Sequence, residues 1–483
     1  MPIQMSPDDI RAVYRQGEGA VVSLVAMLID RLNALENEVA RFKGIINKDS
    51  HNSSKPPSSD QFRKPHNLRE KTGRKSGGQP EHPGKTLAMS ETPDIVVDYF
   101  VSGKCSCGYC LDNIEALTFE RRQEVDIPQV NPKITEHRAE IKKCPGCGKV
   151  HKGKFPSNVV APVQYGAGAK ATAVYLNQYQ LIPLERTAEL FKHLFHLPVS
   201  EGSLVTFARQ AYEGLEKTEN DIVEQIRAAK VAHFDETGMY VEKKRGWLNV
   251  AGTQQLTRYF FHDRRGKEAM DAANILPHFN GTAVHDGLKS YFLYTCKHGL
   301  CNVHHLREMK FQVEQCHQQW AKNMTRHLID IKVQVAATKK KQETCLTKEV
   351  LECFEKRYDD IIGQGHKENI VIPVKPKPGK RGRTAQSSAR NLLDRFKKYH
   401  TAVLLFMYDF DVPFDNNLAE RDGRMTKVQQ KISGCFRSRM GAYTFCRIRS
   451  YISTVRKQGR DVYESIVKVF SVNNGSTNLL PEQ

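Results

Sequence analysis

The chain has 483 residues and a net charge of +19, with 73 Lys and Arg residues against 54 Asp and Glu residues. A chain of this length can form three or more domains, and its positive charge indicates an anionic partner such as DNA or RNA. A membrane span is disfavoured because no run approaches 18 apolar residues. A secreted protein is disfavoured because the start MPIQMSPDDIRAVYRQ lacks the basic and apolar regions of a signal peptide. We therefore expect a cytoplasmic protein without a membrane partner.

Residues 1–48 are predicted to form an N-terminal helix with a coiled-coil seam. Between residues 21 and 42, apolar side chains recur at alternating steps of four and three; they are Val21, Val25, Leu28, Leu32, Leu35, Val39 and Phe42. This a/d pattern extends over three heptads and predicts self-association into at least a dimer. A lone amphipathic helix packed on its own protein is the alternative interpretation.

Residues 49–90 are predicted to be a basic, disordered linker. The segment is rich in Ser, Pro, Gly and Lys and has too few apolar residues to form a core. From Lys55 to Lys85 it carries eight Lys and Arg residues against three acids. Such a segment either follows a phosphate backbone when DNA binds or is a plain solvated linker.

Residues 91–160 are predicted to be a zinc-binding domain, with strand-like runs DIVVDYFV and KITEHRAEIKKC around two cysteine clusters. KCSCGYCLDN and KKCPGCGKVH each place a Cys-x-x-Cys pair beside glycine, which lets the backbone turn so that its amides face the sulfur atoms. Four thiolates can then bind Zn²⁺ tetrahedrally at about 2.3 Å, and without an open coordination position the metal is expected to be structural. The expected ligands are Cys107, Cys110, Cys144 and Cys147, and Cys105 is an alternative to Cys110.

Residues 161–229 are predicted to be a helical domain that resembles a helix-turn-helix. The stretch AGAKATAVYLNQYQ is followed by LERTAELFKHLF, a tight HLPVS, and a long EGSLVTFARQAYEGLEKTENDIVEQIRAA. The turn contains Pro198, and Ser200 is the expected N-cap of the third helix. DNA reading is one interpretation of this arrangement, and a helical spacer packed on the next domain is the other.

Residues 230–315 change to a strand pattern and are predicted to begin an α/β core. KVAHFDETG is expected to be a strand that ends at Asp235, and GWLNVAGT and LTRYFFH are expected to be the next two strands. The helix GKEAMDAANILPHF leads to a fourth strand, GTAVHDG, that ends at Asp286, and HGLCNVHHLREM contains a fifth strand running into a helix. Three antiparallel strands, a crossover helix and two further strands are the order of the ribonuclease-H-like fold.

This order places the ends of the first and fourth strands side by side, so Asp235 and Asp286 are expected to lie a few Å apart. Two carboxylates at that distance repel each other unless a cation lies between them, and hard oxygen ligands suit Mg²⁺ or Mn²⁺. A later helix, in FDNNLAERDGRMTKVQQKISGCFRSRMG, can place Glu420 across the two aspartates. Two metal ions held about 3.5–4 Å apart can activate a water or a 3′-hydroxyl and stabilise the leaving oxygen of a phosphodiester.

The same helix carries basic residues that are expected to face DNA phosphates. At steps of three and four, Arg424, Lys427 and Lys431 follow Asn416 or Asn417 and Glu420 on nearly one face. The full set of expected DNA contacts is Arg307, Arg421, Arg424, Lys427, Lys431 and Arg437. Between the two parts of the core, residues 316–400 are predicted to be a helical insertion with a basic linker. Residues 401–470 are expected to complete the core and 471–483 to be a flexible tail, so the chain is predicted to be a multidomain α+β protein.

The motifs HFDETG, VHDGLKSY, LCNVHHLREM and PFDNNLAERDGRMTKVQQKISGCFRS resemble those of the large transposase of the insertion sequence 66 family, a bacterial group of DDE transposases. The resemblance extends over nearly the whole chain, from NSSKPPSSD to FCRIRSYISTVRKQG. It implies that Asp235, Asp286 and Glu420 are the DDE triad, with two Mg²⁺ or Mn²⁺ ions per active site. Water would cut each transposon end, and the freed 3′-hydroxyl would attack target DNA. The expected location is the bacterial cytoplasm, at the nucleoid.

The resemblance also implies supporting residues around the triad. Cys301-x-x-His304 matches a Cys-x-x-His element that some DDE enzymes carry, and Asn417 is expected to support the site; a buried Cys with a His satisfying a loop is the alternative for the first pair. Small accessory transposition proteins are conceivable partners beside DNA and a second copy of the chain. Two rival functions are a ribonuclease-H-like nuclease such as a junction resolvase, and a sequence-specific DNA-binding protein with an inactive triad.

Overall fold

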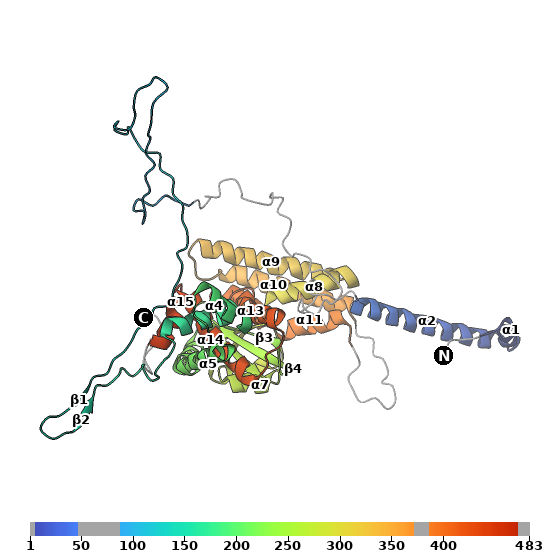
Figure 1. The fold of residues 1–483 in the computed structure, drawn as a ribbon. Coiled ribbons are helices and arrows are strands. Elements are labelled where there is room, and N and C mark those ends of the chain that lie inside the picture. The colour runs from blue at the N-terminus through green and yellow to red at the C-terminus, as the bar shows by residue number, and fades with distance from the viewer. Residues whose placement is uncertain (1–4, 47–86, 371–385, 472–483) are drawn as a thin grey trace. The chain divides into compact units, whose positions relative to one another are not determined.

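The computed structural model describes residues 5–46, 87–370 and 386–471 (Figure 1). These residues divide into two compact units: 87–136 with 189–198 form the smaller unit, and the other described residues form the larger one. Residues 49–86 of the linker predicted at 49–90, and residues 472–483 of the tail predicted at 471–483, therefore lie outside the described residues. Among the described helices, none is long and apolar enough to cross a membrane.

The N-terminal segment is helical, as predicted, but it consists of two helices. Helix α1 (Pro7–Arg15) begins at a capping box in which Ser6 and Asp9 exchange hydrogen bonds, and α2 (Glu18–Ile46) follows after Gly17. Gly17 has a φ of +98°, which ends the first helix. The predicted seam on α2 is solvent-facing in a single chain: Val25, Leu28, Leu32 and Leu35 are 39–60% exposed.

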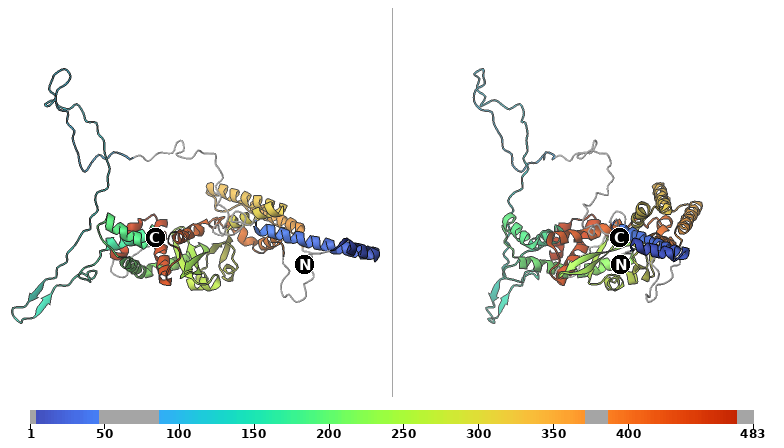
Figure 2. Two further views of the ribbon diagram at one scale, coloured as in Figure 1. Left: turned by 45° about the vertical axis from the view of Figure 1, so that its right-hand side comes forward. Right: turned by 90° about the vertical axis from the view of Figure 1, so that its right-hand side faces the viewer.

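A five-stranded sheet forms the centre of the larger unit, with the strands in the order β5-β4-β3-β6-β7 (Figures 1 and 2). The strands are β3 (Val231–Val241), β4 (Lys244–Gly252), β5 (Thr257–His262), β6 (Thr282–His285) and β7 (Lys297–Leu300). β3 pairs antiparallel with β4, and β4 with β5, whereas β6 pairs parallel with β3 on one side and with β7 on the other. This agrees with the predicted succession of strands, including the adjacency of the first and the fourth.

Helices cover both faces of this sheet because strand residues alternate between the faces. On one face, Met239, Leu248 and Phe261 pack with residues of α13 (Asn417–Ser433) and α14 (Arg439–Lys457). On the other, Phe234 and Ala251 pack with the crossover of α7 (Lys267–Ala273) and the 3-10 turn η3 (Leu276–His278), and with α6 (Glu216–Ala228).

A separate apolar core holds the helices between β7 and α13. They are α8 (Asn302–Cys316), α9 (Gln319–Lys340), α10 (Lys348–Glu368), α11 (Ser388–Lys398) and α12 (His400–Tyr408). Trp320, Tyr358 and Phe396 are fully buried in this core. The basic stretch between α10 and α11, residues 371–385, lies outside the described part of the chain.

The helical segment before the sheet contains more elements than predicted. They are α3 (Ala167–Val174), the π-helical turn η2 (Tyr175–Tyr179), α4 (Leu184–Leu194), α5 (Glu201–Gly214) and α6, and α3 packs on α15 (Val462–Ser471). Ser200 caps α5 as predicted, because its Oγ accepts from the Ser203 N–H at 3.1 Å. The predicted long third helix is wrong: it breaks at Leu215, where φ and ψ of −95° and 3° interrupt it. The DNA-reading helix-turn-helix stays a prediction.

Fewer strands surround the cysteine clusters than predicted. Only β1 (Ile141–Lys143) and β2 (Val150–Lys152) form a hairpin, at the end of KITEHRAEIKKC. The predicted strand DIVVDYFV at 94–101 is wrong, since these residues adopt no strand. An extended run becomes a strand only when its amides pair with a neighbour, and within the described residues no such pairing is present at 94–101.

Candidate active site

Parallel pairing of β3 with β6 positions the two aspartates. The register pairs Val231 with Thr282 and His233 with Val284. Continued by two residues along both segments, it sets Asp235 opposite Asp286. Asp286 follows the last residue of β6, and its Oδ1 accepts from the Leu288 N–H at 2.9 Å. Gly287 permits this tight turn with a φ of +90°.

The prediction that the first strand ends at Asp235 is wrong. Strand β3 continues to Val241, because it pairs with β4 along a long hairpin. Its parallel partner, however, stops two residues before Asp235. On the side of β6, Asp235 therefore lies beyond the last paired residue of β3, and this leaves space beside its carboxylate for Asp286.

Asn416 connects the third acid to these strands. Its Nδ2 donates to the carbonyl of Phe234 at 2.8 Å, its Oδ1 accepts from His233 Nδ1 at 2.8 Å, and its backbone N–H donates to Cys301 Sγ at 3.1 Å. The side chain is 1% exposed. Helix α13 begins at the next residue, so Asn416 fixes the start of α13 against β3 and places Glu420 one turn later.

The sequence predicted Asn417 as a residue that supports the site, and that role stays a prediction; the hydrogen bonds to β3 and to Cys301 are made by its neighbour Asn416. Asn417 is exposed, and its backbone carbonyl accepts from Arg421 Nε within the helix. The asparagines are adjacent, and only the fold decides which of them points inward. Sequence reasoning did not single out His233. Because His233 lies two residues before Asp235 on the same strand, it lies on the same face, and this spacing could have indicated it.

The three acids lie close enough together for the charges of Asp286 and Glu420 to affect the pKa of Asp235. Burial raises the pKa of Asp235 well above its usual range, and the charges of Asp286, Glu236 and Glu420 raise it further. Glu420 lies 3.8 Å from His304 and 4.0 Å from Arg307 at the closest atoms, and its buried Oε1 accepts no hydrogen bond from any residue that the structure describes. A carboxylate oxygen without a donor, next to two other acids, fits a divalent cation better than a proton. Among the described residues, the ligand atoms of Cys301, His304 and Glu420 lie within 4.8 Å of one another, but those of the three acids do not form such a group; Asp235, Asp286 and Glu420 would have to move closer together to hold one ion.

Glu236 shows the opposite arrangement on the other face of β3. Its carboxylate accepts from the Tyr291 hydroxyl at 2.6 Å and from Arg265 Nε at 2.9 Å. Burial still raises the pKa of Glu236, but Tyr291 and Arg265 counteract that rise. This acid is a fully partnered structural residue that sequence reasoning did not single out.

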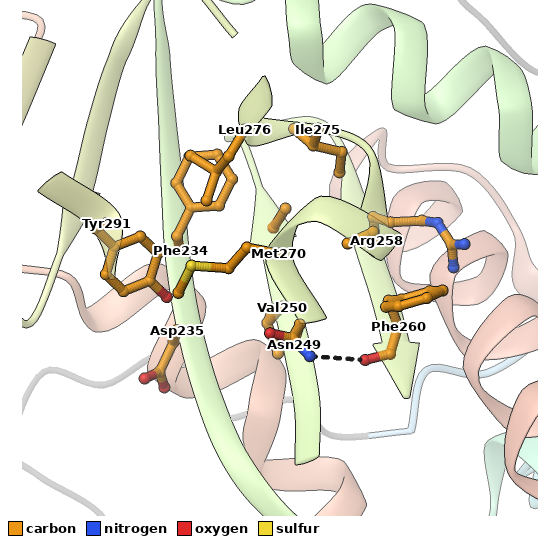
Figure 3. A pocket seen from close by; sticks show the side chains of 12 residues that line it. Phe234, Asp235, Asn249, Val250, Arg258, Phe260, Met270, Ile275, Leu276 and Tyr291 are labelled. Carbon is orange, nitrogen blue, oxygen red and sulfur yellow. Dashed lines mark hydrogen bonds between the residues drawn. The ribbon is translucent and has the colours of Figure 1, made fainter. Parts of the chain in front are cut away.

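An apolar pocket lies on the face of Glu236 and not where the three acids converge. Figure 3 shows Phe234, Met270 and Leu276 among its lining side chains, with the Asp235 carboxylate directed away from them. The lining contains few groups that could take part in chemistry. Asp235 is also among the residues that line the pocket, but its carboxylate is directed toward the other acids' side of the strand, so the active-site candidate is the group of three acids.

The predicted basic row after Glu420 divides in two. Arg421, Arg424, Lys431 and Arg437 are exposed, as a phosphate-binding surface requires. Lys427 is only half-exposed and donates to the carbonyl of Gly238, so it turns back onto β3. Burial lowers the pKa of Lys427, and the nearby Arg245 lowers it further.

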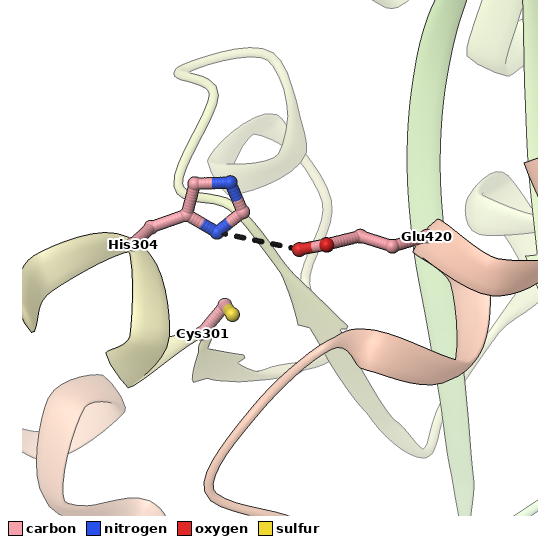
Figure 4. A group of neighbouring side chains, drawn as sticks. All are labelled: Cys301, His304 and Glu420. Atoms are coloured by element: carbon pink, nitrogen blue, oxygen red, sulfur yellow. Dashed lines mark ion pairs between the residues drawn. The ribbon is translucent and has the colours of Figure 1, made fainter. Parts of the chain in front are cut away.

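Cys301 and His304 reach Glu420, in agreement with their predicted place beside the triad. Cys301 is the N-cap residue of α8, and burial raises its pKa to about 12. His304 follows in the first turn of α8, and burial lowers its pKa. Figure 4 shows both side chains directed toward Glu420; one ligand atom of each of the three residues lies within 4.8 Å of the others.

The cysteine turn at 144–149 has the geometry of a thiolate-binding loop. The Cys144 N–H donates to the Lys149 carbonyl at 2.8 Å, and Gly148, with a φ of +71°, donates to the Cys144 carbonyl at 2.9 Å. Hydrogen bonds from the backbone amides of Cys147 and Gly146 lower the pKa of the Cys144 thiol. The amides face the sulfur, as the sequence predicted.

The turn at 105–109 repeats this pattern around a different pair than the expected Cys107 and Cys110. The Cys105 N–H donates to the Tyr109 carbonyl, and Gly108, with a φ of +93°, donates to the Cys105 carbonyl. The backbone amide of Cys107 lowers the pKa of Cys105, while the Cys110 thiol donates to Asp112. The local geometry therefore favours Cys105 over Cys110 as the partner of Cys107.

Comparison with known families finds three matches. The family described as Transposase IS66 family matches residues 162–444, more than half of the chain. The zinc-finger binding domain of transposase IS66 matches residues 103–148, which include both cysteine turns and support the predicted Zn²⁺. A family of unknown function matches residues 9–88. No curated protein matches the chain.

Proposed function

Because the chain belongs to the transposase IS66 family, we propose that it cuts DNA at the ends of its element and joins the freed 3′-hydroxyls to target DNA. The observation that carries this proposal is the convergence of Asp235, Asp286 and Glu420 from three separate elements. A structural role alone would favour partners for these acids such as those of Glu236. The strand order β5-β4-β3-β6-β7 supports a ribonuclease-H-like core.

In the proposed reaction, each element supplies one group. Strand β3 holds Asp235, the turn after β6 holds Asp286, and α13 holds Glu420 at the distance set by Asn416. Divalent metal bound by these carboxylates, Mg²⁺ or Mn²⁺, supplies activation of the attacking hydroxyl and stabilisation of the leaving oxygen. The chain itself positions the carboxylates; burial and the neighbouring acids raise the pKa of Asp235, so a bound cation would favour its ionised form.

The DNA backbone is proposed to lie across the exposed cations next to the triad. Arg307 lies 4.0 Å from Glu420 and is only partly exposed, so it would contact the phosphate nearest the reacting one. Arg421, Arg424, Lys431 and Arg437 would neutralise phosphates farther along the strand, and this contribution weakens as salt rises. Lys427, bonded to Gly238, would support β3 instead of tracking DNA.

The exposed seam of α2 supports a dimer or larger assembly. Leu28, Leu32 and Leu35 would be buried only against another helix of the same pattern. Two copies could hold the two ends of one element. Accessory proteins stay a prediction.

The test is cleavage of end DNA in vitro by the full chain in Mg²⁺. The wild type should nick the end, and Asp286→Ala should still bind it in a mobility-shift assay without cutting. Asp263→Ala is the matched control, because Asp263 is an exposed aspartate paired with Arg439 away from the triad; it should cut like the wild type. Binding without cutting by the wild type would favour an inactive DNA-binding protein, and cutting of four-way junctions without strand joining would favour a resolvase.

A further inference from the structure

We propose that Cys301, His304 and Glu420 form a second metal site, suited to a borderline-soft divalent ion such as Zn²⁺, and that this site shares Glu420 with the carboxylate centre. The proposal rests on the proposed function only for the role of Glu420 in cleavage. The site itself rests on the geometry of three side chains from two helix starts (Figure 4).

The local folding brings the three donors together. Cys301 is the N-cap residue of α8, directly after β7, and His304 lies three residues later. Positions three apart share a side of a helix, and both side chains point to the first turn of α13, where Glu420 lies. His304 Nδ1 is 3.8 Å from Glu420 Oε1, and one ligand atom of each residue lies within 4.8 Å of the others.

These distances are close to those of a metal site with three protein ligands. Zn²⁺ binds nitrogen and oxygen at roughly 2.0–2.2 Å and sulfur at roughly 2.3 Å in a tetrahedron, so two ligand atoms of one ion lie roughly 3.3–3.8 Å apart. For a nitrogen and an oxygen ligand the range is roughly 3.3–3.6 Å, and the His304–Glu420 distance of 3.8 Å exceeds it only slightly. Side-chain adjustments on the order of 1 Å would bring Cys301 into the same range, with the fourth position open to solvent or substrate.

The hydrogen bonding of the cluster indicates a missing ligand. His304 Nδ1 and Glu420 Oε1 are buried, and neither has a hydrogen-bond partner among the described residues. Buried polar atoms are usually satisfied, and exceptions need an explanation. Cys301 Sγ, in contrast, accepts the backbone N–H of Asn416 at 3.1 Å, and an N–H donor of this kind supports a thiolate ligand.

The donor set distinguishes this site from the carboxylate centre. A thiolate, an imidazole and one carboxylate favour Zn²⁺ over Mg²⁺, which prefers oxygen alone. On binding, the Cys301 thiol would release its proton to solvent and the metal would take its place. Because Glu420 is common to both sites, Zn²⁺ held by Cys301 and His304 would keep that carboxylate on the α8 side and compete with its use beside Asp235.

The primary test is the zinc content of the full chain after equilibrium dialysis against limiting free Zn²⁺. Wild type should bind one more zinc per chain than Cys301→Ser and His304→Ala. The matched control is Cys296→Ser, since Cys296 is also buried but lies outside the cluster; it should keep the wild-type number. Zinc in the cysteine turns at 105–110 and 144–147 is common to all four proteins and cancels in the comparison. Equal zinc content in all four would overturn the proposal.

Further measurements distinguish the loss of the metal site from a loss of folding and from a failure of the proposed function. Thermal unfolding followed by circular dichroism checks each variant, and His304→Ala keeps the test valid if the buried Cys301→Ser fails to fold. With Co²⁺ in place of Zn²⁺, the thiolate-to-metal absorption should fall in Cys301→Ser by the share of one thiolate and stay unchanged in Cys296→Ser. A wild type that binds the extra zinc, and that cuts no end DNA in Mg²⁺ even after this zinc is removed, supports the metal site and contradicts the proposed function. Cleavage without the extra zinc contradicts the metal site alone.

Discussion

On the two faces of the central sheet, neighbouring acids have opposite surroundings. On the face covered by α13, Asp235 lies close enough to Asp286 and Glu420 for their charges to raise its pKa, and its Oδ1 accepts only the adjacent Glu236 N–H among the described hydrogen bonds. On the face covered by α7, Glu236 is held by Tyr291 and Arg265. Both are carboxylates of one strand, one residue apart.

The difference separates a structural acid from a functional one. The partners of a buried carboxylate, such as a hydroxyl and a guanidinium, offset the cost of burying it, whereas a carboxylate beside other carboxylates costs stability until a cation binds. Functional sites are often such places, where the protein retains an arrangement that does not favour its own stability. The predictions below test this contrast, and each compares two residues or two conditions.

The largest effect is expected at Asp235. Asp235→Asn should lower end cleavage by roughly three orders of magnitude or more, since a metal ligand contributes several kcal/mol to the barrier. The same change should raise the unfolding free energy of the metal-free protein by about 1 kcal/mol, because it removes one of several repelling charges. Single-turnover cleavage and urea unfolding measure the two quantities. A variant that loses stability together with activity would contradict the contrast between the faces.

The next effect is expected at the start of α13. Asn416→Ala should lower cleavage by about 10- to 100-fold, the usual cost of losing a residue that orients a metal ligand, because Asn416 anchors the turn before Glu420. Asn417→Ala is the matched control, one residue away and exposed, and should cleave within about twofold of wild type. Equal losses in both variants would show that the anchoring contacts do not matter. Cleavage rates at saturating Mg²⁺ provide the comparison.

On the opposite face, Glu236→Gln should affect stability more than activity. It removes the charge that Arg265 pairs with and should lower the unfolding free energy by about 1–2 kcal/mol. Cleavage per folded molecule should stay within about tenfold of wild type, since the glutamate faces away from the triad. Denaturant unfolding with parallel cleavage assays checks both. Abolished cleavage at unchanged stability would place Glu236 among the metal ligands instead.

A pH-dependent effect on stability is expected from His327, in the apolar core of the helical insertion. Burial lowers its folded-state pKa to about 4, against about 6.5 in an unfolded chain. Above pH 6.5 neither state binds the proton, and between 6.5 and 4 only the unfolded state does. Stability should therefore fall as pH drops through this window, by up to about 1.4 kcal/mol per pH unit. His327→Phe should reduce this slope in urea titrations, and an identical slope in both proteins would refute the assignment.

Much of the fold was predictable because the strand pattern and the motif spacing are local. The succession of five strands and the side-by-side placement of the first and fourth follow from alternation, turn residues and the crossover helix between them. The end of β3 was not predictable, since β3 passes Asp235 only through its hairpin with β4. The prediction of a strand at 94–101 was wrong for a related reason, because β propensity alone does not provide the neighbouring strand with which these residues would have to pair.

Within the candidate site, the sequence predicted which acids meet but not what holds them. The partners of Glu236 lie 29 and 55 residues away, and the hydrogen bonds of Asn416 reach back 115, 182 and 183 residues. Such contacts depend on packing and leave no periodic signal. The inward turn of Lys427 has the same origin, because only the fold shows that the carbonyl of Gly238 lies within its reach.

The central claim is that Asp235, Asp286 and Glu420 together carry out DNA transposition. It is tested most directly by a mating-out assay, with the gene expressed beside a marker flanked by its native genomic borders. Wild type should transfer the marker, and Asp286→Ala, produced at the same level, should transfer none above background. Transfer by Asp286→Ala at the wild-type frequency would contradict the account.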